Sequence, residues 1–336
     1  MPTDSRDSRF SPLAGGDAPD AAADGARPSL SQAFTKLQQR LHALASSAEN
    51  ASAHAGFLSA FEALHAEFIA LVREQPDAAL TALIFDASQD RPHYSARHGL
   101  LCAALADLSA DQLGWPEAWR RAITHAALSM NLAIAAEQDR LASHPVRLSE
   151  GERNAIAGHG VRSAELLELC GVRDTLWLDT VCQHHDAEAG PLQGRAASHQ
   201  LARLLHRIDV FCARLSPRAN RRAQSGAAAT RAVYLDELMK PDDAGAVLVK
   251  TVGLYPPGTL VRLSSGELGL VCRRGARAMA PCVAALAGAD AKAYEQPQLR
   301  QVVGQGPLSV AASLAPHEVK QTEALDGLLD RVLELC

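Results

Sequence analysis

The sequence predicts a mainly α-helical protein with a small helical unit near its N-terminus and a short β-hairpin element near its C-terminus. Aromatic residues make up only 4% of the 336 residues, and alanine, the strongest helix former, is abundant. Apolar residues recur at helical spacing almost throughout the stretch from about residue 94 to 250. Closer to the C-terminus, apolar residues alternate on both sides of Ser264-Ser265-Gly266, which is typical of a β-hairpin.

Composition and charge narrow the classes of function. Hydrophobic residues make up 47% and the net charge is −5, as in soluble globular proteins that do not bind a nucleic acid polymer. No stretch approaches 18 consecutive apolar residues, and the N-terminus does not have the pattern of a signal peptide. We therefore expect a cytoplasmic protein without a membrane span. The seven cysteines show no C-x-x-C spacing and are expected to be reduced.

Four segments are predicted along the chain. Residues 1–30 are rich in Ala, Gly, Asp and Pro and are expected to form a disordered tail. Residues 31–90 form the helical N-terminal region, and residues 94–255 form the main helical domain. Residues 256–336 form an extension with the hairpin and one final helix. The apolar faces of the N-terminal region comprise Phe34, Leu37, Leu41 and Leu44, followed by Phe61, Leu64, Phe68, Leu71 and Val72.

Local signals mark the boundaries of these segments. The polar stretch 86–93 separates the N-terminal region from the main domain, and the sequence YPPG at 255–258 ends the helices. Ser149, followed three residues later by Glu152, predicts a capping box at a helix start. The chain closes with an amphipathic helix whose apolar positions are Leu325, Leu328, Leu329 and Val332.

Two adjacent histidines, His184 and His185, end an apolar segment and suggest a metal site. Neutral imidazoles are common ligands of transition metals, but a pair alone cannot complete a coordination sphere. His98 opens an apolar helix, and His159 lies within the stretch NAIAGHGVRSAELL. Asp209 lies between apolar neighbours in LLHRIDVFCARL, where a buried carboxylate needs a partner.

Taken in order, these residues resemble the HD-GYP branch of the HD-domain phosphohydrolases over roughly residues 94–275. The segment VGLYPPGTLVRLSSGELGLV is also similar to the C-terminal element of that family. The resemblance implies a helical HD-domain bundle with a metal centre and a role in bacterial cyclic di-GMP signalling. The positions that match the family's metal ligands are His98, His159, His184, His185 and Asp209.

The chain departs from this family at the defining His-Asp pair. The register places Met130 and Asn131 there, and Ile134 replaces the lysine that often follows. The Gly-Tyr-Pro loop is shortened, since residues 190–194 carry no tyrosine. The resemblance implies that the family's aspartate bridges two metal ions and that its histidine completes one of them. Asn131 offers a neutral oxygen, which is a poor bridge between two dications, and the thioether of Met130 is too soft for iron, manganese or magnesium.

These departures leave one ligand set intact. The first metal would keep only His98 and Asp209, so we expect the dinuclear site to be lost. The second would keep the three remaining histidines, a ligand set with which zinc activates water. Asn131 could add a fourth oxygen. We therefore expect one divalent transition metal (Fe, Mn or Zn), or none if the site is fully degenerate. The three histidines are His159, His184 and His185.

Each candidate also has a structural interpretation that stays open. The histidine pair could cap a helix end, His159 could lie at the surface near a helix start, and His98 and Asp209 could persist as a buried hydrogen-bonded pair. Met130 is expected to fill the core. His125 lies five residues earlier and faces roughly 140° away on the same helix, so it is expected to pack or to lie at the surface and not to replace a ligand.

Two further groups of side chains are weaker candidates. His206 lies three residues before Asp209, on the same helical side, and could act as a substitute ligand. The basic stretch after that helix could hold phosphates, although a solvated loop is the commoner explanation. Its arginines are Arg218, Arg221 and Arg222.

Three functions fit the sequence, and we favour the first. It is a degenerate, catalytically weak or inactive regulatory protein that binds a cyclic dinucleotide or a signalling protein such as a diguanylate cyclase. The second is an active metal-dependent phosphodiesterase or phosphohydrolase that uses the three-histidine site. The third is a structural adaptor in which the polar groups are remnants. The replacement of the bridging pair by Met130 and Asn131 within an otherwise similar scaffold favours the first.

Overall fold

The structure is a computed structural model that describes residues 28–336 apart from 146, 186–187, 238, 304–306 and 320–321. The predicted disordered tail, residues 1–30, therefore lies almost wholly outside the described residues. Helix α1 (Leu30–Ser47) begins at the last residue of that predicted tail. Its N-cap Ser29 and the side chain of Gln32 form a capping box, which satisfies two backbone amides at the helix start.

The N-terminal region consists of three α-helices with a single 3-10 turn between the first two. They are α1, η1 (Ala51–Ala53), α2 (His54–Glu74) and α3 (Pro76–Ala87). Pro76 suits the first position of α3, where a backbone amide has no partner inside the helix. The predicted apolar faces point into the core. Phe34, Leu37, Leu41, Phe61, Leu64, Phe68 and Val72 are buried, and Leu44 and Leu71 are partly buried.

One helical stretch, Ala51–Glu74, is long and apolar enough to cross a membrane by length and composition, with a mean hydropathy of 1.4. A search for uninterrupted apolar runs does not detect this helix, because isolated polar residues such as Glu62 and His65 interrupt the run. Core helices of soluble proteins meet the same criterion. Phe57, Phe61 and Phe68 of this stretch are buried inside the protein. The cytoplasmic location remains a prediction.

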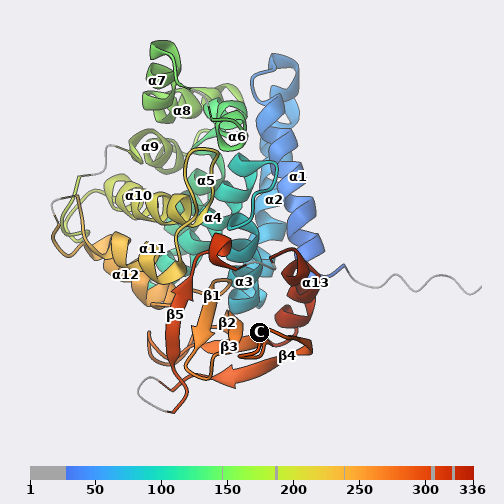
Figure 1. Ribbon diagram of the computed structural model, residues 1–336. Helices are drawn as coiled ribbons and strands as arrows, with labels where there is room; N and C mark the ends of the chain where they lie inside the picture. Colours follow the sequence, from blue (N-terminus) through green and yellow to red (C-terminus); the bar gives the residue numbers. More distant parts are fainter. Residues whose placement is uncertain (1–27, 146, 186–187, 238, 304–306, 320–321) are drawn as a thin grey trace, which may run out of the picture.

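Between α3 and the sheet, the described residues form ten helical segments, and α4 lies among them at the centre of the molecule (Figure 1). It packs against α1, α3, α5, α6, α10 and α12, because its many small side chains let neighbouring helices approach closely. The segments are α4 (Tyr94–Gln112), α5 (Glu117–Ser129), η2 (Leu132–Ile134), α6 (Ala135–Ser143), α7 (Glu150–Ala157), α8 (His159–Leu169), α9 (Thr175–Gln183), α10 (Ala197–Leu215), α11 (Gly226–Tyr234) and α12 (Asp243–Val252).

The helical pattern that begins after Ser149 is interrupted at Gly158. The capping box of Ser149 and Glu152 is present, which confirms the predicted helix start. Gly158 then ends α7 with φ −95° and ψ 9°, and α8 begins at the next residue. The break makes His159 the first residue of α8 instead of an interior residue of one long helix.

The C-terminal β element is larger than the hairpin that the sequence predicts. The hairpin itself is present, with Gly266 at φ 86° in its turn. Three further strands complete an antiparallel sheet in the order β4-β3-β2-β1-β5. The alternation pattern misses β3 because it is buried at every position, and β4 because most of its residues are exposed and polar. The strands are β1 (Leu260–Leu263), β2 (Leu268–Arg273), β3 (Cys282–Ala287), β4 (Ala293–Gln301) and β5 (Val310–Leu314).

The last helix, α13 (Thr322–Leu333), follows a short turn η3 (Pro316–Glu318) and packs against β4, α1 and α3. Leu329 and Val332 are buried there, which agrees with the predicted closing helix. One cluster of buried apolar residues extends from α1 to α13. Figure 1 shows the sheet at one end of the molecule and α7 and α8 at the other, so the candidate ligand His159 lies far from the sheet.

Candidate metal centre

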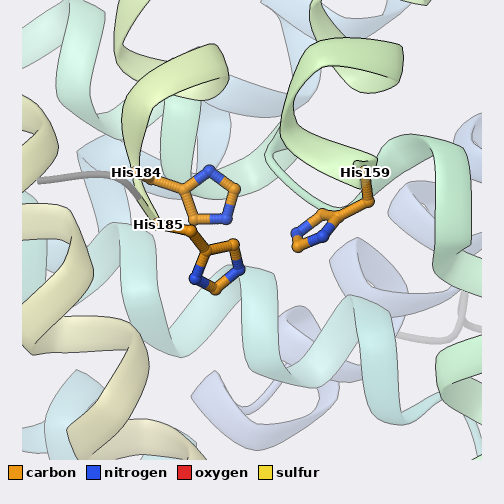
Figure 2. A group of neighbouring side chains, drawn as sticks. All are labelled: His159, His184 and His185. Atoms are coloured by element: carbon orange, nitrogen blue, oxygen red, sulfur yellow. The ribbon is translucent and has the colours of Figure 1, made fainter. Parts of the chain in front are cut away.

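Three predicted ligand histidines lie together between the start of α8 and the end of α9 (Figure 2). His159 is the first residue of α8, and His184 and His185 directly follow α9. The ring centroid of His159 lies 5.0 Å from that of His184 and 4.8 Å from that of His185, and the adjacent pair is 4.1 Å apart. One ligand atom from each residue lies within 4.8 Å of the others. The fold thus brings this predicted set together.

Backbone carbonyls fix the tautomers of two of these rings. Nδ1 of His159 donates to the carbonyl of Ile156 at 2.6 Å, and Nδ1 of His184 donates to the carbonyl of Val181 at 2.7 Å. Because a carbonyl can only accept, the proton resides on Nδ1 and the lone pair of a neutral ring is on Nε2. Both Nε2 atoms are buried and have no hydrogen-bond partner among the described residues.

The electrostatic environment favours neutral rings at this position. Burial, with a further contribution from His185, lowers the pKa of His184 to about 3. Burial also lowers the pKa of His159. An unsatisfied buried acceptor costs about 1–3 kcal/mol, whereas metal ligation through Nε2, with Nδ1 bonded to a carbonyl, satisfies both ring nitrogens. These residues therefore fit a divalent transition metal, and the exposed ring of His185 lies at the solvent side.

Gly160 allows the two helices that carry these histidines to touch. A Cβ at this position would lie 3.0 Å from the carbonyl oxygens of both Val181 and Cys182, and 3.4 Å from Cε1 of His184. Any larger residue would have to push the start of α8 away from the last turn of α9. This role was not predicted from the sequence, although a glycine directly after a candidate ligand was a signal for it.

The other predicted pair, His98 and Asp209, forms an ion pair with 2.7 Å between Nε2 and Oδ1. Burial alone would lower the pKa of His98, but Cys102 and Asp209 outweigh it and raise the pKa to about 10. Burial opposes ionisation of Asp209, yet the hydrogen bond and charge of His98 hold its pKa well below the usual range. This pair matches the buried hydrogen-bonded alternative that the sequence left open.

Cys102, which was not predicted from the sequence as a candidate ligand, completes the group of His98 and Asp209. Sγ of Cys102 lies 3.5 Å from Nε2 of His98, and the donor atoms of Cys102, His98 and Asp209 lie within 4.8 Å of one another. The signal was the spacing, since residues four apart on a helix are neighbours. All seven cysteines lie in the described chain and are free thiols. The charge of Asp209 also acts on His184 and His185, so the two groups adjoin.

Met130 and Asn131 lie between α5 and η2, and Ile134 is the last residue of η2. Met130 is fully buried in the main apolar cluster, as expected for a core residue, and Ile134 is also buried. Asn131 is 8% exposed and lines a cavity of about 20 Å³ next to Leu41 and Ser95. Among the described residues, no hydrogen bond joins its side chain to the three histidines. The fourth oxygen remains a prediction.

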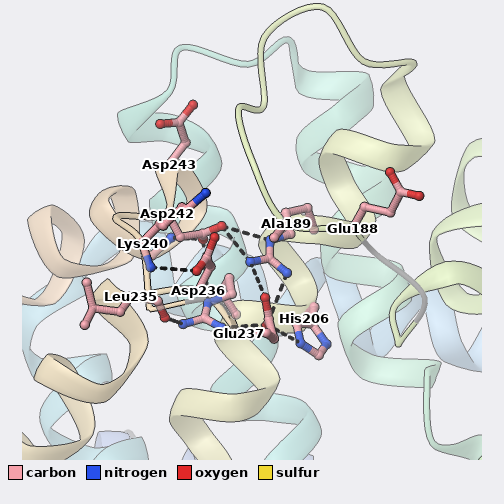
Figure 3. A network of polar contacts seen from close by, with 12 residues as sticks. Glu188, Ala189, His206, Leu235, Asp236, Glu237, Lys240, Asp242 and Asp243 are labelled. Carbon is pink, nitrogen blue, oxygen red and sulfur yellow. Dashed lines mark hydrogen bonds and ion pairs between the residues drawn. The ribbon is translucent and has the colours of Figure 1, made fainter.

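His206, the predicted substitute ligand, is engaged elsewhere (Figure 3). Its Nδ1 donates to the carbonyl of His184 at 3.0 Å, and its Nε2 lies 3.3 Å from Oε1 of Glu237. His206 therefore positions the main chain of a candidate ligand. Glu237 also pairs with two neighbouring arginines of α10, which lowers its pKa to about 2 against the effect of burial. These are Arg203 and Arg207, and Arg203 pairs in addition with Asp242.

Residues 188–195, in the loop after the histidine pair, are held by hydrogen bonds between side chains and the backbone. The guanidinium of Arg195 donates to the carbonyls of Glu188 and Ala189, each at 2.7 Å. The amide of Leu192 donates to Asp243 at 3.2 Å, which links the loop to the start of α12. Residues 188–195 of this loop therefore have defined contacts.

The predicted phosphate-binding arginines lie in different environments. The guanidinium of Arg218 donates to the Tyr94 hydroxyl at 2.7 Å and lies 4.6 Å from the centroid of that ring. The Tyr94 ring in turn stacks on His98, so Arg218 lies next to the second group. Arg221 bonds to the carbonyl of Ala213, and Arg222 is exposed.

Among the described residues, four groups of side chains could hold a metal ion, and two of them lie outside the predicted site. One contains Glu62, His65 and His125. His125 is buried against Trp177, with ring centroids 4.5 Å apart, and its Nε2 lies 3.3 Å from Glu62. Nε2 of His65 donates to the hydroxyl of Thr124 at 2.8 Å. These contacts agree with the expected packing role of His125.

A comparison with known proteins finds one similarity of this chain to a named enzyme. The chain is 28% identical over 217 residues to a protein of Pseudomonas aeruginosa named cyclic di-GMP phosphodiesterase PA4108. The match covers 63% of this chain and 52% of that protein, so the chain spans about half the length of this curated relative. No protein-family model matches the chain. No solved structure matches it significantly.

Proposed function

We propose that this chain is a degenerate, HD-GYP-like protein of cyclic di-GMP signalling. It binds a cyclic dinucleotide, or a signalling protein such as a diguanylate cyclase, and hydrolyses phosphodiesters weakly or not at all. The observation that carries the proposal is the fully buried apolar side chain of Met130 beside Asn131, where the resemblance implies a ligand histidine and a bridging aspartate. The similarity to a cyclic di-GMP phosphodiesterase supports the class of ligand.

The ligand chemistry argues for one metal instead of two. His159, His184 and His185 would hold a divalent transition metal, which would act as a Lewis acid toward a phosphoryl oxygen. The carboxylate of Asp209 already forms an ion pair with His98. Without a bridging carboxylate, the chain has no second cation to stabilise the leaving oxygen, which weakens hydrolysis while phosphate binding is retained.

Arginines next to the site would supply the remaining affinity for phosphate. A guanidinium presents several N–H donors that match phosphate oxygens. Arg218 lies beside the group that contains His98, and Arg221 and Arg222 follow on the same loop. We propose that these three arginines contact the phosphates of the nucleotide.

The alternative function is an active phosphodiesterase that uses the three-histidine site. The observation that favours it is the pair of buried Nε2 atoms without partners on His159 and His184, because neutral imidazoles with free lone pairs are ready metal ligands. Turnover of cyclic di-GMP distinguishes the two functions.

The first experiment measures metal, binding and turnover on the same protein. The wild-type chain is purified without chelator, its metals are counted by elemental analysis, and cyclic di-GMP is added for calorimetry and for chromatography of products. We expect His159→Ala to remove one metal per chain, and His199→Ala, at an exposed histidine of α10, to remove none. We expect cyclic di-GMP to bind without multiple turnover.

Three results would contradict this proposal in different ways. Robust hydrolysis that His184→Ala abolishes would establish the alternative function. Two metals lost together in His159→Ala would show that Met130 and Asn131 do not break the dinuclear site. If that variant removed no metal and the nucleotide did not bind, the structural adaptor would remain.

A further inference from the structure

A separate group of metal-binding side chains lies where the N-terminal region meets the main helical domain. It contains His42 of α1, His93 directly before α4, and Asp139 of α6. We propose that these three residues form a zinc site that ties α1 to α4 and α6. None of them belongs to the candidate centre described above, so the proposal does not depend on the proposed function.

The distances fit a single ion. The rings of His42 and His93 have centroids 3.9 Å apart, and Nδ1 of His42 lies 3.4 Å from Oδ2 of Asp139. One ligand atom of each residue lies within 4.8 Å of the others. Zinc binds nitrogen and carboxylate oxygen at about 2.0–2.2 Å, so two donors at a tetrahedral angle lie roughly 3.4 Å apart. The spacing of His42 and Asp139 is therefore that of two ligands on one ion.

Local contacts orient two of the three donors. Oδ1 of Asp139 accepts the backbone amide of Ser95 at 2.7 Å, which leaves Oδ2 directed at His42. His93 has φ 59° and ψ 47°, a left-handed conformation that residues other than glycine rarely adopt. Such strain costs about 1–3 kcal/mol and persists where surrounding contacts require it. Here it places the His93 ring against that of His42.

The surroundings suit zinc and permit its entry. Two imidazoles and one carboxylate are ligands that zinc commonly takes, and water can complete the coordination. All three residues are partly exposed, with 35% of the His42 side chain and 20% of the Asp139 side chain accessible. The nearby guanidinium of Arg97 donates to the carbonyls of Asp86, Gln89 and Arg91 and so does not occupy the donors.

The position of the site gives it a structural consequence. Helix α6 directly follows η2 and therefore the Met130-Asn131 segment. An ion shared by α1 and α6 would fix the N-terminal region relative to that segment. Zinc occupancy would thus control how firmly the two parts of the helical core are joined.

The test is a zinc titration of the full-length His159→Ala protein, in which a ligand of the first centre is absent. We expect one zinc per chain by calorimetry and a higher melting temperature with zinc. Adding Asp139→Asn or His93→Asn should weaken zinc binding at least about 100-fold, since loss even of an indirect partner of a metal ligand costs 10–100-fold. Both variants keep the backbone, because an amide oxygen can still accept from Ser95 and asparagine tolerates the left-handed conformation.

A histidine on the same helix provides the matched control. His144 is exposed at the C-terminal end of α6, and His144→Ala should leave zinc binding unchanged. Zinc binding of equal affinity in the Asp139→Asn and His93→Asn variants would overturn the proposal and leave a simple contact between His42 and Asp139. The difference in zinc bound by the wild type and by His159→Ala measures the three-histidine site alone. Absence of zinc from either site can therefore be detected independently of the other.

Discussion

At the scale of single residues, the chain itself provides the partners that orient its candidate ligands. His159 and His184 each donate Nδ1 to the carbonyl three residues earlier, that of Ile156 or Val181. His206 then holds the carbonyl of His184 from α10. Such indirect partners fix the tautomer and direction of a ligand ring. Two of the three ligands are therefore oriented before any metal binds.

Gly160→Ala is expected to damage the centre although alanine favours a helix. The new Cβ would lie 3.0 Å from two backbone carbonyls of α9, and this overpacking costs about 1–3 kcal/mol of stability. We expect metal bound by the three histidines to be held at least about 10-fold more weakly, measured by competition with a chromophoric chelator.

Gly151→Ala is the matched control for this substitution. Gly151 lies in α7, and a Cβ there would meet no atom within 4 Å. The change should raise stability by about 0.5–1 kcal/mol and leave metal affinity as it is. Equal metal affinity in the two glycine variants would show that close helix contact at Gly160 is not required.

At the scale of helices, α10 is joined to α12 by a buried ion pair. The guanidinium of Arg203 contacts Oδ1 of Asp242 at 2.6 Å and 3.0 Å, and both side chains are inaccessible to solvent. The other oxygen of Asp242 accepts the amide of Gly245 at 2.8 Å and so caps α12. The pair therefore positions two helices that flank the loop after the histidine pair.

Arg203→Met is expected to lower the free energy of unfolding by up to about 3–5 kcal/mol, because it removes the hydrogen-bonded counter-ion of the buried Asp242. Only Arg207 would then remain near this carboxylate, with its Nε 3.6 Å from Oδ2. Arg140→Met, which removes a partly exposed partner of Glu152, should cost less than about 1 kcal/mol. Urea unfolding of the two variants measures both values. Similar costs would show that burial of the Arg203 pair has no special effect.

The sequence predicts local features of these elements better than contacts between distant segments. Helical periodicity, the capping box at Ser149 and the hairpin at Gly266 are all present in the structure, because each depends on neighbouring residues. The strands β3 and β4 were not predicted, since burial at every position of β3 and exposure of most of β4 remove the alternation that marks a strand. The burial of β5 also does not alternate regularly along the strand.

In the candidate site, too, local patterns are easier to predict than contacts between distant segments. The spacing and order of its histidines point to a metal set, and the fold places His159, His184 and His185 together. The role of His206 could not be predicted, because its contact with the His184 carbonyl joins segments 22 residues apart. Cys102 could have been predicted as a neighbour of His98, since it lies one helical turn after it.

At the scale of the whole molecule, neutral buried histidines make stability depend on pH. Burial lowers the pKa of His65, His125 and His184 to about 3, whereas an unfolded histidine titrates near 6.5. Between these values the unfolded chain binds protons that the folded chain does not. Stability present above pH 6.5 is therefore lost as the pH falls toward 3, by up to about 1.4 kcal/mol per histidine and pH unit.

This dependence is measured by urea unfolding at several pH values between 7.5 and 5, with a chelator present so that bound metal does not contribute. His65→Gln should reduce the slope by up to one proton, since it removes one buried titrating ring. His199→Gln, at an exposed position, should leave the slope unchanged. A wild-type slope no steeper than that of His65→Gln would contradict the assignment.

The packing of α13 against α1 also sets an order of events during synthesis. The hydroxyl of Ser31 donates to Asp330 at 2.6 Å, and Phe34 and Leu329 line one small cavity between the two helices. A ribosome makes α1 early, yet residues 322–333 emerge hundreds of residues later. Until then the apolar face of α1 lacks one of its neighbours, so part of that surface stays uncovered while the intervening segments are synthesised.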